Sequence, residues 1–576
     1  MLNYFRITDE SFRLVYKNPM EEPAALSVPV MGLRDACAFQ VLVQCDHYYS
    51  LQLNRQEYIS VFNWQAGLQD RLRMEITSDL PVSAFIEDMH TDDDLLKRAD
   101  ALSHLPHKDS SPHLPLAVWV EMTSDENTRP GLYPVNIKVY HSGHNGDERL
   151  VKEETVQVEV LNVKMPLPKD RVMDFSLWQH PSNIARQHDV PLWSEEHFVL
   201  LDRYAKCLAG LGKSFITCMV SEIPWRGQSC FMDKLYGGDL YEYSMIRVTR
   251  DQSGAFKYDF SPMQRYIDLC RAAGLGPTVE LFGLINVWDK PILTPQPMCR
   301  EFPEAIRVRY LDEQDGCMKY MRSADQLREY VRAVYNYFVE TEQVDQVILS
   351  ADEPGDIELF RTSMNMLKEL CPRFKMHVSI NHTEFIQEFS DRLCGFAPHL
   401  SCCLEQYDFL IEYKKNHPEV GLTWYMCCGS GFPNHFIRTH PIESRFTGPF
   451  TYYMGFDGFG RWAFTCWPKD PRQDVRYSEF EAGDPFFVYP ARNGEPMLSL
   501  RYKNLQRGNT DFEILHMAEK KIGRKQVLAM LEKIVPQGKL EEFNNFEYDL
   551  QPERPFSLIW EDYNTLKRDL LKLLAE

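Results

Sequence analysis

Two adjacent carboxylates, Asp352 and Glu353, directly follow a short run of aliphatic residues and precede Pro354. A pair of carboxyl groups can carry out general acid/base chemistry on a glycosidic bond. The charge of Asp352 would disfavour ionisation of Glu353, so Glu353 would remain the better proton donor. We therefore interpret the pair as candidate catalytic residues.

The order of residues around the pair also permits a second interpretation. Consecutive side chains of a regular strand point to opposite faces, so both carboxylates reach one pocket only where the strand ends or bulges. Pro354 favours such a break. Alternatively, Asp352 or Glu353 lies at the N-terminus of a helix, with Pro354 in its first turn, and interacts favourably with the helix dipole. The sequence leaves both interpretations open.

Aromatic and polar residues recur near the predicted strand ends and could complete a ligand pocket. Sugar rings stack on aromatic faces, and polar side chains hydrogen-bond their hydroxyl groups. Any one of these residues alone is more often a structural residue, and only their joint placement favours binding. The predicted substrate-binding residues are Trp178, His180, Glu280, Asn381, His382, Trp424, Tyr425, His435, Trp462 and Trp467.

The elements that must position these residues are predicted in the region 169–498. Short apolar strands alternate there with amphipathic helices, which favours a (β/α)8 TIM-like barrel, with a doubly wound open sheet as the rival. Barrel strands deliver their last side chains to the end where active sites lie. Helices are predicted at 196–211, 262–273, 324–340 and 357–371, and strands at 172–178, 215–220, 277–282, 344–350, 376–380, 400–404, 422–427 and 459–464.

The two ends of the chain differ from this central region. Residues 1–165 show strand-like alternation between turn signals, which predicts an N-terminal β-sandwich. Closely spaced prolines at 165–168 predict a linker. Residues 499–576 carry helical spacing and are predicted to form a C-terminal helical segment packed on the barrel. The predicted fold class is therefore α/β, with a β-sandwich before the barrel and helices after it.

Composition excludes several classes of partner. The formal net charge of −20 argues against nucleic acid, because phosphate binding needs a surplus of Lys and Arg. No stretch approaches the ~18 apolar residues of a membrane span, and the N-terminus shows no leader pattern. The 15 cysteines include no CxxC pattern, which suits a reducing compartment. We expect a cytoplasmic protein, or a periplasmic or secreted one if a leader has been removed.

Two further patterns argue against a cofactor. His435 and His440 have a tolerable spacing for zinc, but no CxxC accompanies them. The glycine-rich segment 455–460 lacks the strand and helix that flank a dinucleotide-binding GxGxxG motif. We predict no metal and no organic cofactor.

Several segments together resemble glycoside hydrolase family 123 and its large group of little-studied relatives. One is the strand that ends in Asp352, Glu353 and Pro354, and the resemblance extends over about residues 115–520. The order of a β-sandwich followed by a barrel is similar to the architecture of that family. The other segments are 455–462 (GFDGFGRW), 483–490 (GDPFFVYP), 499–501 (SLR) and 507–508 (RG).

The resemblance implies a retaining β-N-acetylgalactosaminidase that works by substrate assistance on a glycan or glycoconjugate. The 2-acetamido oxygen of the substrate would attack the anomeric carbon and form an oxazolinium ion. Asp352 would orient the acetamido group and stabilise its positive charge. Glu353 would protonate the leaving oxygen and then deprotonate the incoming water. A glycosidase of the same fold on another sugar and a non-catalytic carbohydrate-binding protein are the alternatives.

Overall fold

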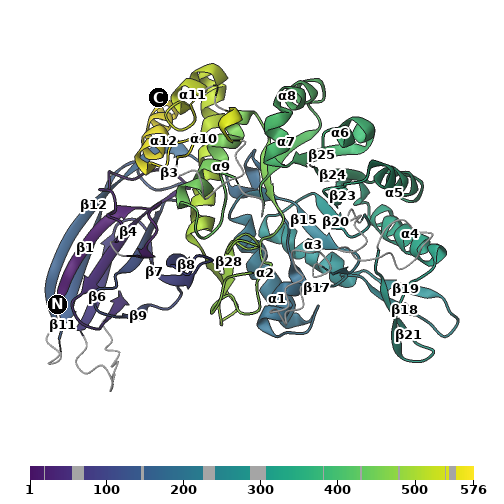
Figure 1. Cartoon of the computed structure of the whole chain (residues 1–576), viewed down its shortest axis with the longest axis horizontal. Coiled ribbons are helices and arrows are strands. Elements are labelled where there is room, and N and C mark those ends of the chain that lie inside the picture. Colours follow the sequence, from purple (N-terminus) through teal and green to yellow (C-terminus); the bar gives the residue numbers. More distant parts are fainter. Residues whose placement is uncertain are drawn as a thin grey trace.

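The structure is a computed structural model of the whole chain, and it combines sheets and helices in a mixed α/β fold (Figure 1). In Figure 1 the N-terminal sheets lie on one side, the parallel strands with their helices on the other, and the C-terminal helices above the junction. The residues described are 1–17, 20–54, 70–143, 148–224, 241–285, 306–380, 382–427, 431–477, 480–536, 538, 540–543 and 553–576.

The N-terminal region contains two six-stranded sheets, which are mostly antiparallel and share one hydrophobic core. Alternate residues of β4 and β10, such as Val41 and Val118, meet residues of β6 and β11, such as Met74 and Ile137, in that core. The first sheet has the order β1 (Leu2–Asp9), β4 (Ala36–Cys45), β10 (Leu116–Thr123), β7 (Val82–Thr91), β8 (Lys97–Leu102) and β2 (Val15–Tyr16). The second has the order β3 (Val30–Leu33), β12 (Glu148–Lys164), β11 (Gly131–Ser142), β6 (Asp70–Ser78), β5 (Tyr49–Leu53) and β9 (His107–Ser110).

The central region is built around a parallel sheet of nine strand segments that forms a nearly closed barrel. The two segments at its edges, β14 and β15, are separated in the chain only by Phe215. The runs of buried residues in the strands of this sheet, such as Ile216–Met219 and Val347–Asp352, are typical of parallel strands that are covered on both faces. The order is β14 (Lys213–Ser214), β13 (Asp174–Leu177), β27 (Gly458–Arg461), β26 (Gly421–Tyr425), β25 (Leu393–Pro398), β24 (Lys375–Ile380), β23 (Val347–Asp352), β20 (Val279–Phe282) and β15 (Ile216–Met219).

Helices follow most of these strands, and their apolar faces contribute to the core around the parallel sheet. The expected helix 324–340 is confirmed as α4, which begins with a capping box of Ser323 and Gln326. The helices of this region are α1 (Pro181–His188), α2 (Glu195–Ala209), α3 (Ser261–Ala273), α4 (Ala324–Glu340), α5 (Ile357–Leu370), α6 (Glu384–Phe389), α7 (Leu400–Glu405), α8 (Tyr407–Asn416) and α9 (Pro441–Met454).

Smaller pieces accompany the barrel. A hairpin pairs β16 (Ile223–Pro224) with β17 (Tyr241–Glu242), and a second pairs β28 (Val488–Pro490) with β29 (Pro496–Leu498). A four-stranded sheet contains β19 (Phe256–Asp259), β18 (Arg247–Arg250), β21 (Arg309–Asp312) and β22 (Cys317–Tyr320).

One predicted strand is wrong. The segment 400–404 is not a strand but most of helix α7, and the sixth strand of the barrel is β25, which ends at Pro398. The reason is that Leu400, Cys403 and Leu404 recur at helical spacing, and the side chain of His399 caps the helix by accepting a hydrogen bond from the Ser401 amide (3.3 Å).

The C-terminal helices α10 (Leu500–Ile522), α11 (Arg524–Leu531) and α12 (Trp560–Ala575) do more than cover the barrel. Helix α10 packs on α9 where two glycines meet: a Cβ on Gly448 would lie 1.9 Å from the Gly508 carbonyl oxygen. Helix α12 instead lies on the N-terminal sheets, where Lys567 forms a buried ion pair with Asp35 (2.8 Å). These helices therefore join the two regions. The predicted domain limits stay a prediction.

Buried ion pairs reinforce this junction. Arg507 on α10 binds both Glu10 (3.0 Å) and Glu121 (2.6 Å), and Arg445 on α9 binds Asp511 (2.6 Å). All of these side chains are at most a tenth exposed. Breaking one of these pairs would be strongly destabilising, because removing one partner leaves an uncompensated buried charge. Within the described ranges, no helix is both long and apolar enough for a membrane span.

Candidate active site

The predicted carboxylate pair lies at the carboxyl end of strand β23. Asp352 is the last residue of the strand and pairs with Ser379 of β24. Glu353 follows with a left-handed backbone (φ 46°), and its amide donates to the Ser379 carbonyl oxygen (2.8 Å). A non-glycine residue in this region is strained and is frequent at functional sites. The strand therefore ends between the two carboxylates, and its regular alternation of side chains ends there too.

The alternative that the pair begins a helix is not what the structure contains. Helix α5 begins at Ile357, and its N-cap is Asp356, whose side chain accepts from the Leu359 amide (2.9 Å). Asp352 and Glu353 thus precede the cap, and the helix does not need them for capping.

Tyr425 and His399 approach the carboxylates from neighbouring strands. Tyr425 is the last residue of β26, and its hydroxyl donates to Glu353. Burial, and then the charge of Glu353, raise the pKa of Tyr425 well above its usual value, and Asp352 adds to this effect. Both carboxylates therefore act on one hydroxyl, as expected if they face one site.

His399 is a site residue that the sequence did not indicate. It directly follows β25, and its ring meets that of Tyr425 edge-on at 5.1 Å. Burial works to lower the pKa of His399, but a hydrogen bond with Cys427 and the charge of Glu353 outweigh it, so this pKa lies above its usual value. A cationic imidazole here would stabilise the carboxylate form of Glu353. Pro398 ends β25 and could have indicated that His399 follows a strand, but the sixth strand was predicted at 400–404 instead.

Aromatic residues gather at the carboxyl ends of other strands of the same barrel. Trp178 directly follows β13 and packs edge-on against Phe282, the last residue of β20, at 4.9 Å. Trp462 directly follows β27 and packs on Phe480 at 5.1 Å. Because parallel strands end at the same end of the barrel, these rings and the carboxylates lie at one end. Trp178, Phe282 and Phe480 belong to one apolar cluster, and Trp462 packs against it.

Polar contacts fix the orientation of Trp462. Its indole N–H donates to Asp484 (3.0 Å), and Asp484 also pairs with Arg461, the last residue of β27. The Nε2–H of His180 donates to the carbonyl oxygen of Trp462 (3.1 Å). Burial lowers the pKa of His180 to about 4, so its imidazole is neutral near pH 7. The prediction missed Arg461 and Asp484 as site residues, although both lie in segments that carried the resemblance.

Glu280 lies inside the barrel on β20, fully buried. Its carboxylate accepts from the hydroxyl of Thr217 on β15 (3.0 Å). Burial raises the pKa of Glu280 to about 7, and hydrogen bonds from Ser350, Thr217 and Trp178 partly offset this shift. Glu280 thus contacts one predicted binding residue, Trp178, from within the barrel.

Three predicted binding residues are fully buried and have partners other than the carboxylates. Trp424 is fully buried, and its indole donates to Thr451 of α9 (2.8 Å). His435 is enclosed between Phe459 and Phe487, and burial holds its pKa well below the usual value. The indole of Trp467 donates to the Val488 carbonyl oxygen (2.6 Å). The physical reason in each case is an apolar environment with a local hydrogen-bond partner.

Two further predictions concern the end of β24. His382 is largely exposed and lies 3.9 Å from Glu384. Asn381 lies outside the described residues. As for a metal, among the residues that the structure describes, His, Cys, Asp and Glu form no group of three or more that could hold an ion.

The barrel with this end of paired carboxylates and aromatic rings has the organisation of a glycoside hydrolase. Residues 178–518 match the description "Glycoside hydrolase 123, catalytic domain". This match covers more than half of the chain and includes every site residue named above, so the chain belongs to glycoside hydrolase family 123.

A solved structure of the same family shares this fold. The chain is similar to a family 123 glycoside hydrolase from Clostridium perfringens studied for glycolipid glycan hydrolysis, with a TM-score of 0.71 and 16% identity over 100% of this chain and 97% of that one. A putative glycoside hydrolase from Bacteroides vulgatus is 10% identical over 78% of this chain and 77% of that one, with a TM-score of 0.31, too low to support any argument. A comparison with curated proteins finds no match.

Proposed function

We propose that the protein is a retaining glycoside hydrolase that removes terminal β-linked N-acetylgalactosamine by substrate-assisted catalysis. The observation that carries the proposal is the pair at the end of β23, where the left-handed Glu353 follows the strand end at Asp352 and accepts a hydrogen bond from Tyr425. Family membership supplies the reaction class, and the pair supplies the two groups that this reaction needs.

In this mechanism the 2-acetamido oxygen of the substrate attacks the anomeric carbon. Asp352 orients the acetamido group and stabilises the positive charge of the oxazolinium ion. Glu353 protonates the leaving oxygen, and its carboxylate then removes a proton from the incoming water. This water attacks the anomeric carbon and opens the oxazolinium ring, so the product retains the anomeric configuration. Substrate-assisted enzymes need no fixed separation between two carboxylates, so adjacent residues can serve.

The remaining site residues have supporting roles in this proposal. Tyr425 and His399 stabilise the carboxylate form of Glu353 between its two proton transfers. Trp178 and Trp462 provide aromatic surface for the sugar. We also interpret β14 and β15 as two parts of one strand, which makes the barrel a (β/α)8 barrel, and the two N-terminal sheets as a β-sandwich.

The first experiment is hydrolysis of nitrophenyl β-GalNAc beside the β-GlcNAc and β-galactose analogues. Release that is selective for GalNAc supports the proposal. Glu353→Gln should reduce kcat on a natural β-GalNAc glycan by ~10²–10⁴-fold, because the leaving oxygen loses its proton donor. Asp352→Asn should also cripple the enzyme, while both variants keep their melting temperature. A glycolipid glycan belongs in the substrate panel because the Clostridium perfringens relative was studied with one.

Other outcomes identify the alternatives. Cleavage of β-galactoside at a rate similar to β-GalNAc would exclude substrate assistance and favour another sugar. Sugar binding without turnover, unaffected by Glu353→Gln, would indicate a carbohydrate-binding protein. Near wild-type turnover in either variant would contradict the assigned roles.

A further inference from the structure

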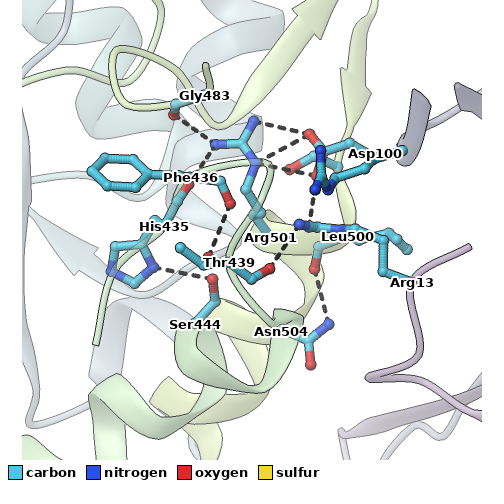
Figure 2. Close-up of polar contacts among 12 residues, drawn as sticks. Arg13, Asp100, His435, Phe436, Thr439, Ser444, Gly483, Leu500, Arg501 and Asn504 are labelled. Atoms are coloured by element: carbon cyan, nitrogen blue, oxygen red, sulfur yellow. Dashed lines mark hydrogen bonds and ion pairs between the residues drawn. The ribbon is translucent and has the colours of Figure 1, made fainter. Parts of the chain in front are cut away.

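One arginine of α10 connects the N-terminal sheets to the wall of the candidate site. Arg501 and Asp100, on β8, are both fully buried, and they form a bidentate pair in which the arginine Nη2 lies 2.9 Å from Asp100 Oδ2 (Figure 2). The arginine Nε lies 3.1 Å from each carboxylate oxygen. Arg13 approaches the same carboxylate at 3.1 Å, and Tyr489 donates its hydroxyl to it at 2.7 Å.

The other side of the same guanidinium binds three backbone carbonyls of the barrel region. Its Nη1 donates to the carbonyl oxygens of Gly483 (2.7 Å), Phe486 (2.7 Å) and His435 (3.1 Å). Figure 2 shows the Gly483 and His435 contacts on the side of Arg501 opposite Asp100. Gly483 has φ +90°, and a Cβ there would lie 3.0 Å from the guanidinium carbon, so this close approach requires glycine.

Asp484, which orients Trp462, lies in the chain between Gly483 and Phe486. Asp484 follows Gly483 directly, accepts the indole N–H of Trp462 (3.0 Å), and pairs with Arg461. The loop is also bonded to the barrel by the Cys466 amide, which donates to the Pro485 carbonyl oxygen (3.0 Å). A continuous series of direct contacts therefore runs from Asp100 through Arg501 and this loop to Trp462.

We propose that Arg501 is a positioning residue for substrate binding: by clamping the 483–486 loop to Asp100 of the N-terminal sheets, it fixes Asp484 and hence the indole of Trp462 at the end of β27. The N-terminal sheets thereby help to shape the sugar pocket. This inference rests on the proposed function, because it assigns Trp462 to the sugar.

The chemistry of the clamp requires arginine. A guanidinium presents donors in a planar fork, so one side chain can bind a carboxylate on one edge and carbonyls on the other. An ammonium at the same place keeps the charge but cannot span both partners. Arg501→Lys therefore separates the geometry of the clamp from its charge, and Asp100→Asn removes the charge of the partner while keeping an acceptor.

The test is a double-mutant cycle with Arg501→Lys and Trp462→Phe, measured on nitrophenyl β-GalNAc. Each single variant should raise KM by about tenfold with a smaller change in kcat, since a displaced binding group loses much of its contribution. The double variant should be no worse than the poorer single variant, because both changes affect one interaction. Asp100→Asn should repeat the KM effect if Arg501→Lys does not fold.

Hydrogen exchange supplies a measurement that needs no activity. Amides of residues 480–488 should exchange faster in Arg501→Lys than in wild type. The control is Lys567→Gln, which breaks the buried pair with Asp35 at the same junction but touches neither the loop nor the site. It should lower the melting temperature and leave KM and the exchange of 480–488 unchanged.

The outcomes separate this inference from the proposed function. If the wild type hydrolyses no β-GalNAc substrate but the loop still exchanges faster in Arg501→Lys, the clamp stands and the proposed function fails. Additive KM effects in the double variant would overturn the positioning role. So would an Arg501→Lys variant whose loop exchange and KM match those of the Lys567→Gln control.

Discussion

Carboxylates that are buried or partly buried occur in two regions of this molecule, and their partners differ. At the junction of the N-terminal sheets with α10, Asp100 is paired with Arg501, and Glu121 with Lys503 and Arg507. Within the barrel, the buried Glu280 accepts from the neutral hydroxyl of Thr217. The partly buried Glu353 accepts from the hydroxyl of Tyr425 and also interacts with His399, whose pKa it helps to raise.

The difference in partners separates Glu121, which stays ionised, from Glu280, which can exchange its proton near neutral pH. At the junction, burial acts to raise the pKa of Glu121, but the charges of Lys503 and Arg507 overcome it and lower this pKa to about 2. Such a group remains ionised at all ordinary pH values. In the barrel, burial raises the pKa of Glu280 to about 7. A carboxyl group that exchanges its proton in the working range of pH needs surroundings of the second kind.

The largest effect on stability is expected from breaking a junction pair. Glu121→Gln would leave Lys503 and Arg507 buried beside a neutral amide, and the free energy of unfolding should fall by ~3–5 kcal/mol. Urea denaturation at pH 7 measures this loss. Because the pKa of Glu121 is lowered, its contribution is present above its ordinary pKa of 4.5 and is lost as pH falls towards about 2. The deficit of the variant should therefore shrink in acid.

A surface pair provides the matched control. Glu126 contacts Lys164 (2.7 Å) and also pairs with Arg34, and the side chains of Glu126 and Lys164 are each about half exposed. Glu126→Gln should change the free energy of unfolding by at most ~1 kcal/mol. If Glu121→Gln lowered the free energy of unfolding no more than Glu126→Gln does, the ion pairs at the junction would not have the structural role that distinguishes them from the barrel carboxylates.

The second effect concerns Tyr425, whose hydroxyl donates to Glu353, the proposed catalytic carboxylate. Tyr425→Phe removes the hydroxyl that donates to Glu353 and keeps the ring that meets His399. A hydrogen bond to a charged group contributes ~1.5–3 kcal/mol, so kcat/KM should fall by roughly 10–100-fold. Steady-state kinetics measure this loss, and thermal unfolding should show a stable protein. An unchanged kcat/KM would remove Tyr425 from the site.

Much of this organisation could be predicted from local sequence. Strand β23 and its carboxylate pair were recognisable because aliphatic residues run directly into Asp352 and Pro354. Helix α4 was equally clear from its spacing and its cap. These signals are local in the chain, and the structure contains both the strand and the helix.

The parts that could not be predicted depend on contacts between distant residues. The indole of Trp424 donates to Thr451 of α9, 27 residues later, and nothing near Trp424 in the sequence indicates this partner. Nothing near Arg501 in the sequence indicates Asp100, which lies 401 positions away. His399 was hidden for a different reason, since a helix with apolar spacing was read as the sixth strand. Sequence thus located most of the strand ends but not the partners of the side chains that follow them.

The smallest effect should come from a junction carboxylate that lacks the partners of its neighbours. Glu87 lies on β7 beside β8, is 1% exposed, and neither of its carboxylate oxygens has a hydrogen-bond partner among the described residues. Burial raises the pKa of Glu87 to about 8, while the charges of Arg13 and Lys108 partly oppose this shift. The folded protein therefore holds this proton more tightly than the unfolded chain does.

The sign of the pH dependence follows from this raised pKa. The stability that Glu87 contributes is fully present below its ordinary pKa of 4.5 and is lost as pH rises through about 8. Glu87→Gln cannot ionise, so at pH 9 the variant should be more stable than wild type by about 1 kcal/mol, the unpaired amide limiting the gain. At pH 5 the two should unfold at nearly the same urea concentration. A variant less stable than wild type at pH 9 would mean that Glu87 is ionised and paired like Glu121. The contrast between carboxylates with cationic partners and carboxylates without them would then not extend to β7.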